Sequence, residues 1–122
     1  MSIYPTLRYA DAKTAIRFLV DAFGFTEKAL MENPDGTVAH AELAWPDGGL
    51  IMIGQRRAEP SPFDTGKVVT YLTLDDPDAH HATAVKAGAE IVHDPTDQDY
   101  GSREYAAKDP EGNVWSFGTY RA

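Results

Sequence analysis

Two short segments of the chain match each other. Residues 46–54 read PDGGLIMIG and residues 110–118 read PEGNVWSFG, at a constant separation of 64 positions. Each has Pro, an acidic residue and Gly, followed by a short apolar stretch that ends in Gly. Gly and Asn suit a tight hairpin turn because they tolerate positive φ. The match predicts a repeated unit, and a repeat determines the architecture of a chain.

The flanking segments repeat at nearly the same separation. Leu7–Asp11 lies 65 positions before Leu72–Asp76, and each runs from an extended stretch through Asp into a helical pattern. Asp suits a helix start and Gly a helix end, so we expect helices from Asp11 to Gly24 and from Asp76 to about Gly88. Pro77 fits the first helical position. The expected buried residues are Ala15, Phe18, Leu19, Ala22 and Phe23 in the first helix, and Ala79, Ala82, Val85 and Ala89 in the second.

Each half therefore reads strand, helix, strand, strand, strand. The middle strands are predicted at 25–32 and 37–45, joined by a turn at 33–36, and at 90–93 and 103–108, joined by a polar stretch at 94–102. We expect an α+β fold, with residues 1–122 forming a single domain of two βαβββ modules, about 1–55 and 67–122. A polar, Pro-containing linker, 56–66, connects them.

Composition limits the functional classes. The chain has 122 residues, 43% of them hydrophobic, no cysteine, and a net charge of −8. The absence of cysteine excludes disulfides and thiolate chemistry. The negative charge disfavours nucleic acids and anionic membranes as partners. Without an apparent signal peptide or a membrane-spanning apolar run, a cytoplasmic protein is expected.

The repeat and its motifs resemble the vicinal oxygen chelate superfamily, which includes glyoxalase I, extradiol dioxygenases and bleomycin-resistance proteins. The residues that carry the resemblance are Leu7–Asp11, Ala15–Phe18, Ala22–Phe25, Leu72–Asp76, Ala87–Glu90 and the turn Asp109–Asn113. The segments His40–Leu43, Tyr100–Arg103 and Trp115–Phe117 are similar to an uncharacterised glyoxalase-like branch. The resemblance implies a glyoxalase-like fold, a ligand cavity between the repeats, and a homodimer.

Metal-dependent members of this superfamily bind a divalent ion through two or more His or Glu ligands on the first and fourth strands of each half. The resemblance places these positions at Tyr4, Met52, Val69 and Ser116. None is a carboxylate or an imidazole, Val cannot coordinate a metal, and the Met thioether is too soft for Mg²⁺, Mn²⁺ or Zn²⁺. We therefore expect no metal and no cofactor.

The histidines offer an alternative chemistry. His40 and Glu42 lie two apart on a predicted strand, so they share a face. They are candidates for an acid–base pair, or form an ordinary polar pair on a solvated sheet face. His80 and His81 are adjacent on the second helix and are expected on its solvated surface, and His93 is expected to be exposed. No nucleophile elbow, phosphate loop or dinucleotide motif is present.

Strand alternation predicts which residues line the cavity. If Leu72 packs against the helices, Tyr71 faces the cavity, while Trp115 and Phe117 belong to the core. The predicted ligand-binding residues are Tyr4, Arg8, His40, Met52, Tyr71, Tyr100, Arg103, Tyr105 and Ser116. Alternatively, Arg103 ties the loop to the sheet by pairing with Asp99 or Glu104. Such a wall suits a flat, partly aromatic molecule with an anionic or carbonyl group.

Three functions remain open. The first is metal-free binding of a small, partly aromatic molecule, as in antibiotic-resistance members of the superfamily. The second is a small-molecule lyase or dioxygenase that uses His40 and Glu42, or a metal site without a recognisable pattern. The third is a structural or regulatory homodimer without a ligand.

Overall fold

The computed structural model describes residues 2–121, which form two compact units. The first unit ends at Gly66 and the second begins at Lys67, and residues 21–23 are grouped with the second unit. No helix in the described part of the chain is long and apolar enough to cross a membrane.

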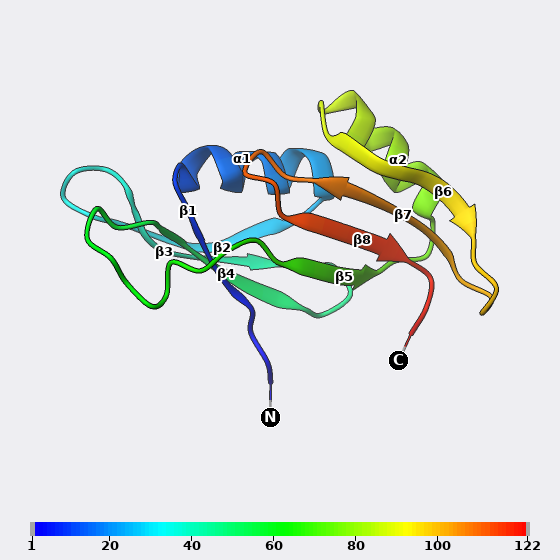
Figure 1. Cartoon of the computed structure of the whole chain (residues 1–122), viewed down its shortest axis with the longest axis horizontal. Coiled ribbons are helices and arrows are strands. Elements are labelled where there is room, and N and C mark those ends of the chain that lie inside the picture. The colour runs from blue at the N-terminus through cyan, green and yellow to red at the C-terminus, as the bar shows by residue number, and fades with distance from the viewer. Residues whose placement is uncertain (1, 122) are drawn as a thin grey trace. The chain divides into compact units, whose positions relative to one another are not determined.

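The first unit contains a four-stranded sheet with helix α1 along one face (Figure 1). Its elements are β1 (Thr6–Tyr9), α1 (Ala12–Phe23), β2 (Thr26–Glu32), β3 (Val38–Ala44) and β4 (Leu50–Gln55). The strand order is β1-β4-β3-β2. β1 runs parallel to β4, and the other neighbours are antiparallel.

The second unit repeats this topology. Its elements are β5 (Val69–Thr73), α2 (Pro77–Lys86), β6 (Glu90–Asp97), β7 (Arg103–Lys108) and β8 (Val114–Gly118). The strand order is β5-β8-β7-β6, again with the first and last strands parallel. The predicted α+β fold with two βαβββ modules is confirmed.

The turns that first indicated the repeat have the same backbone hydrogen bonds. Trp45 N–H donates to Gly49 O at 2.8 Å, and Asp109 N–H donates to Asn113 O at 3.0 Å. The glycine inside each turn has positive φ, 107° at Gly48 and 90° at Gly112. The match in the sequence therefore reflects a match in backbone geometry.

The predicted turn at 33–36 has an equivalent in the second unit that the sequence does not predict. Asn33 N–H donates to Thr37 O, and Gln98 N–H donates to Ser102 O, both at 2.7 Å. β6 contains the strand predicted at 90–93 but continues to Asp97, so the polar connection predicted at 94–102 is too long. The two turns share only a glycine at the equivalent position. The end of β6 was not predicted because it contains Pro95, and Pro usually interrupts the hydrogen bonds between strands.

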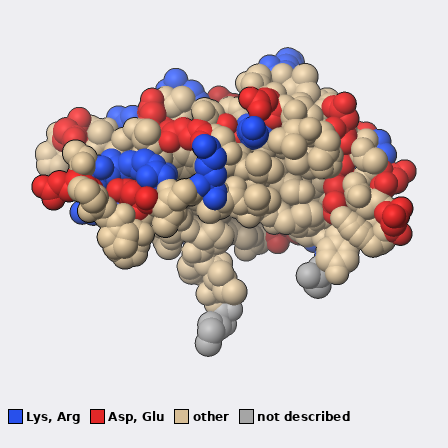
Figure 2. All heavy atoms as spheres, in the orientation of Figure 1, with Lys and Arg blue, Asp and Glu red and all other residues tan. Residues whose placement is uncertain are grey.

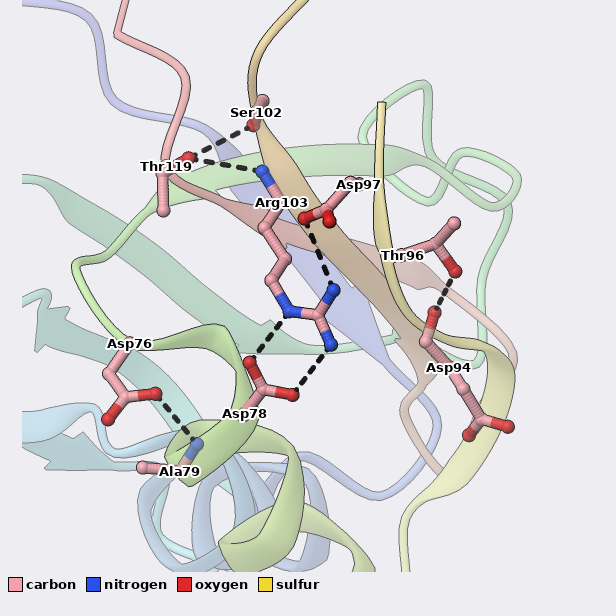
Figure 3. A network of polar contacts seen from close by, with 9 residues as sticks. All are labelled: Asp76, Asp78, Ala79, Asp94, Thr96, Asp97, Ser102, Arg103 and Thr119. Carbon is pink, nitrogen blue, oxygen red and sulfur yellow. Dashed lines mark hydrogen bonds and ion pairs between the residues drawn. The ribbon is translucent and has the colours of Figure 1, made fainter. Parts of the chain in front are cut away.

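Both helices begin at their predicted caps. The Asp11 carboxylate accepts the N–H of Thr14 at 3.2 Å, and the Asp76 carboxylate accepts that of Ala79 at 3.1 Å (Figure 3). α1 ends at Phe23 and is capped by Gly24, which has φ 85°. The predicted apolar face of α1 is buried, except that Phe18 is half-buried.

The predicted buried face of α2 was wrong. Ala79, Ala82 and Val85 are exposed, whereas Pro77 and Ala84 are buried. Alanines spread around the helix gave too weak a period to identify the inner face.

His80 was also predicted incorrectly, because it faces the core and not solvent. The centroids of the His80 and Phe117 rings are 4.4 Å apart. His80 Nδ1 contacts the Tyr105 hydroxyl, and His80 Nε2 contacts the Phe23 carbonyl. His81 contacts Asp94 at 3.2 Å, and His93 is exposed as expected.

Candidate functional site

The first sheet has one buried face and one open face. Leu7 and Ile53 lie on the buried face. The register pairs Thr6 with Met52 and Met52 with Glu42, so these side chains share the open face. Arg8, paired with Gly54, and His40, two residues before Glu42, lie on the same face. Strand alternation thus brings together Arg8, His40, Glu42 and Met52, and all four are half-buried.

His40 and Glu42 form the polar pair that their spacing suggested. His40 Nε2 lies 3.1 Å from Glu42 Oε2, and about one third of each side chain is exposed, 34% and 31%. An imidazole beside a carboxylate is oriented and can accept or release a proton. The pair can therefore serve as an acid–base group or hydrogen-bond a ligand.

The Arg8 side chain lies on this open face, over Gly54 of the neighbouring strand. Its Cδ would be 3.1 Å from a Cβ at Gly54, so the glycine permits the close approach. Its guanidinium pairs with Asp64 Oδ1 at 3.5 Å and lies 5.7 Å from the centre of the Phe63 ring. Asp64 and Phe63 belong to the linker, which therefore folds back over the sheet. No periodic pattern in the sequence indicated this contact.

Tyr4 lies apart from this group. It precedes β1, is 50% exposed, and lines a separate hollow with Trp45 and Leu50. The structure does not place it among the half-buried side chains of the open face.

The second sheet has an equivalent open face. The register pairs Tyr71 with Ser116 and Ser116 with Ala106, while Glu104 pairs with Gly118. Tyr71 and Ser116 therefore share a face, as strand alternation predicted. Trp115 and Phe117 are fully buried on the opposite face, also as predicted.

Glu104 is the polar centre of this face, although its place in the sequence suggested only a pairing with Arg103. It is 8% exposed. Its carboxylate accepts hydrogen bonds from the hydroxyls of Tyr71 at 2.8 Å, Ser102 at 3.0 Å and Tyr100 at 2.5 Å. Burial alone would raise the pKa of Glu104, but these donors, led by Tyr100, hold it below its usual value. The same bond raises the pKa of Tyr100 to about 12.

Alternation along β7 could have identified Glu104. If Tyr105 is a core residue, its neighbour Glu104 must lie on the open face. Tyr105 is instead among the ligand-binding residues predicted from the sequence. In the structure Tyr105 is fully buried, and its hydroxyl lies 2.5 Å from His80 Nδ1, so it is not available at the open face.

Arg103 forms a clasp between three elements of its own unit (Figure 3). Its Nε and Nη2 donate to the Asp78 carboxylate at 2.7 and 3.0 Å, and its Nη1 donates to Asp97 at 3.2 Å. The guanidinium therefore joins β7, α2 and β6. The clasp was anticipated as an alternative to ligand binding, but with Asp99 or Glu104 as the partner and not Asp78 and Asp97.

The four superfamily positions do not supply a metal site in the described residues. Tyr4 and Val69 are exposed, at 50% and 73%, and Met52 and Ser116 are half-buried. Residues 2–121 contain no group of three or more His, Cys, Asp or Glu side chains that could hold an ion. His40 and Glu42 provide two donors, fewer than the three protein ligands usual for a catalytic zinc.

Comparison with known proteins establishes the family. Residues 3–117 match the model of the Glyoxalase/Bleomycin resistance protein/Dioxygenase superfamily, and the chain belongs to this superfamily. An uncharacterised protein of Mycobacterium bovis is 34% identical over 96% of this chain and 82% of its own length.

The fold is shared with solved structures. TioX from Micromonospora sp. ML1 is 31% identical, with a TM-score of 0.80 over 98% of this chain and 100% of that chain. A superfamily member from Sphaerobacter thermophilus has a TM-score of 0.77 at 18% identity over 98% of both chains, which shows the fold alone.

Proposed function

We propose that this chain binds a small, partly aromatic organic molecule on the open face of a sheet without the help of a metal ion. The observation that carries the proposal is the group formed by Arg8, His40, Glu42 and Met52. These side chains share one face and are only half-buried. A cation, a proton-exchanging pair and a polarizable thioether suit a ligand with a flat apolar body and a polar end.

The donor chemistry supports binding without a metal. The superfamily positions carry phenol, thioether, alkyl and hydroxyl side chains, and Val69 has no donor atom. A hard or borderline divalent ion prefers carboxylate oxygens and imidazole nitrogens. Membership of a superfamily that includes bleomycin-resistance proteins is compatible with a binding function.

A thermal-shift assay tests the proposal. The wild-type chain is screened with benzoate, 1-naphthoate and bleomycin, each with and without EDTA. We expect at least one compound to raise the Tm equally under both conditions, because binding to the folded state stabilises it. Arg8→Gln and Met52→Ala should weaken the shift. Arg17→Gln is the matched control, because Arg17 is exposed on α1.

Three results would overturn the proposal. The first is stabilisation that requires a divalent ion, and the second is an equal loss of binding in Arg17→Gln. The third is the absence of any shift with all three probes.

The contact between His40 and Glu42 favours a second candidate, acid–base catalysis on the bound molecule. The 3.1 Å separation of their side chains is suitable for sharing a proton. On this alternative, His40→Gln abolishes turnover of a bound compound and leaves its affinity within about threefold. If both binding and turnover survive the substitution, the alternative is wrong.

A homodimer, implied by the family resemblance, is a further proposal. Light scattering coupled to size exclusion should give twice the 13.4 kDa mass of the chain. A monomer mass at all concentrations would contradict it.

A further inference from the structure

One pocket of the first unit has a charge opposite to that of the whole chain. Its volume is about 550 Å³, within the range typical of small-molecule sites. It lies where the β2–β3 turn and the linker meet the end of the sheet. Arg8, Arg56 and Arg57 line it, with Asp35 as the one acidic residue of the lining. Three of the eleven Lys and Arg of a chain with net charge −8 thus surround one hollow.

The surface view agrees with this arrangement. In Figure 2, Lys and Arg side chains gather over the end of the first unit that holds the linker and the β2–β3 turn, with acidic side chains beside them. A local concentration of positive charge attracts anions even when the net charge of a protein is negative.

The guanidinium groups of two of the arginines have no carboxylate partner in residues 2–121, although the backbone N–H of Arg57 donates to Asp64 Oδ2 at 3.3 Å. Arg8 is paired with Asp64 at 3.5 Å, which compensates its charge. Among the described residues, neither Arg56 nor Arg57 forms an ion pair with Asp or Glu. Arg56 Nη2 donates to the carbonyl of Thr65, which neutralises no charge. The guanidinium of Arg57 has no hydrogen-bond partner in the described residues.

The other polar side chains of the pocket are already engaged within the chain. Asp35 Oδ1 accepts the backbone N–H and the hydroxyl of Thr37, and Asn33 Nδ2 donates to the Thr37 hydroxyl. Gln55 accepts from Ala12 N–H and donates to the Ala10 carbonyl. The guanidinium N–H groups that remain are donors without acceptor capacity. A ligand that satisfies this pocket must therefore supply acceptors and negative charge.

We infer that this pocket binds a small oxyanion group, a carboxylate or a phosphate, through Arg56 and Arg57, and that it takes the anionic end of the organic molecule proposed above. The second half of this inference rests on the proposed function, and the first half does not. Arg8 connects the two places, because it lies on the open face of the sheet and also lines the pocket. Planar guanidinium groups bind such oxyanions with paired hydrogen bonds.

Titration with inorganic phosphate tests the pocket alone. The full chain is titrated with sodium phosphate, with ionic strength held constant by sodium chloride, and binding is followed by amide NMR shifts. We expect saturable shifts at residues 33–39 and 55–58. Arg56→Gln and Arg57→Gln should each weaken binding about tenfold, the loss typical of one charge-assisted hydrogen bond. Arg17→Gln changes the net charge equally on the exposed side of α1 and should leave binding unchanged.

A second titration tests the link to the organic ligand. Benzoate should bind at least about tenfold more tightly than neutral benzamide, and Arg57→Gln should remove most of that preference. If phosphate binds through Arg56 and Arg57 but no aromatic probe binds, the oxyanion pocket is supported and the proposed function is wrong. If benzoate binds equally well to wild type and Arg57→Gln, the proposed function stands and the link to the pocket fails.

The phosphate experiment can overturn the pocket itself. Amide shifts that do not saturate would overturn it. An equal weakening of phosphate binding by Arg17→Gln would also overturn it, because both results indicate general charge screening and not a site. An amide spectrum of each variant that resembles the wild-type spectrum verifies that the fold is retained.

Discussion

At the residue scale, the open faces of the two sheets differ in how their polar groups are satisfied. On the first sheet, His40 and Glu42 are each about one third exposed and are hydrogen-bonded to each other. On the second, the Glu104 carboxylate is buried beneath three hydroxyls. The first arrangement leaves polar atoms accessible to a ligand. The second holds a charge in place and gives that face a fixed shape.

Gly118 makes the arrangement around Glu104 possible. A Cβ at this position would overlap the Tyr71 hydroxyl and the Glu104 side chain. We expect Gly118→Ala to lower the free energy of unfolding by about 1–3 kcal/mol, the usual cost of overpacking. Gly66→Ala is the control, because a Cβ built there meets no atom of the described residues within 4 Å beyond its chain neighbours. Urea denaturation measures both, and an equal stability of the two variants would contradict this account.

His80 should make stability depend on pH. Burial in the aromatic cluster lowers the pKa of its imidazole below the ordinary value of about 6.5. Its Nε2–H donates to the Phe23 carbonyl, which leaves Nδ1 to accept the Tyr105 hydroxyl in the neutral ring. Below about pH 6.5 the unfolded chain binds a proton that the folded chain resists, so the free energy of unfolding falls as the pH falls.

The measurement is urea denaturation between about pH 7.5 and about pH 5.5, above the range where most carboxylates titrate. Stability should fall towards the lower pH in wild type and in His93→Gln, and the fall should be smaller in His80→Phe. A slope that persists undiminished in His80→Phe would show that another group is responsible.

At the element scale, the turn before β8 is held by one side chain. Asp109 is 4% exposed, and its Oδ1 accepts the backbone N–H groups of Glu111 and Asn113. Its Oδ2 accepts from the Asn113 amide and from Trp115 Nε1. The equivalent position in the first module is Trp45, which has the same backbone bonds without a carboxylate. The repeat thus conserves the backbone turn while its side-chain support differs.

Removal of this side chain should destabilise the protein. Asp109→Ala leaves four donors without their acceptor, and we expect a loss of at least about 2 kcal/mol. Asp109→Asn keeps one acceptor oxygen and should cost less. Asp99→Ala, at an exposed position of the β6–β7 turn, serves as the control. Thermal and urea unfolding measure the series, and a loss in Asp99→Ala equal to that in Asp109→Ala would contradict the role of the turn.

Elements marked by a turn motif, a helix cap or a clear hydrophobic period were predictable from the sequence, and elements without such a pattern were not. The paired turns, the Asp caps and strand alternation predicted both modules and placed Arg8, Met52, Tyr71 and Ser116 on open faces. The inner face of α2 was missed, because its alanines spread around the helix carry no clear period. The arginine pocket was missed because Arg56 and Arg57 lie at a strand end and in the linker, where no period applies.

At the scale of the whole molecule, the chain combines a superfamily fold with metal positions that carry no carboxylate or imidazole side chain. Fold alone does not determine function, because one scaffold can carry different sites. The proposal of an organic anion as the ligand rests on the three arginines that line the pocket of the first unit.

Isothermal titration calorimetry of benzoate into EDTA-treated chain is the most direct test of metal-independent binding. The account predicts saturable binding whose affinity is unchanged when Mg²⁺, Mn²⁺ or Zn²⁺ is restored, and which falls in Arg8→Gln but not in Arg17→Gln. Binding that appears only after one of these ions is added would contradict it.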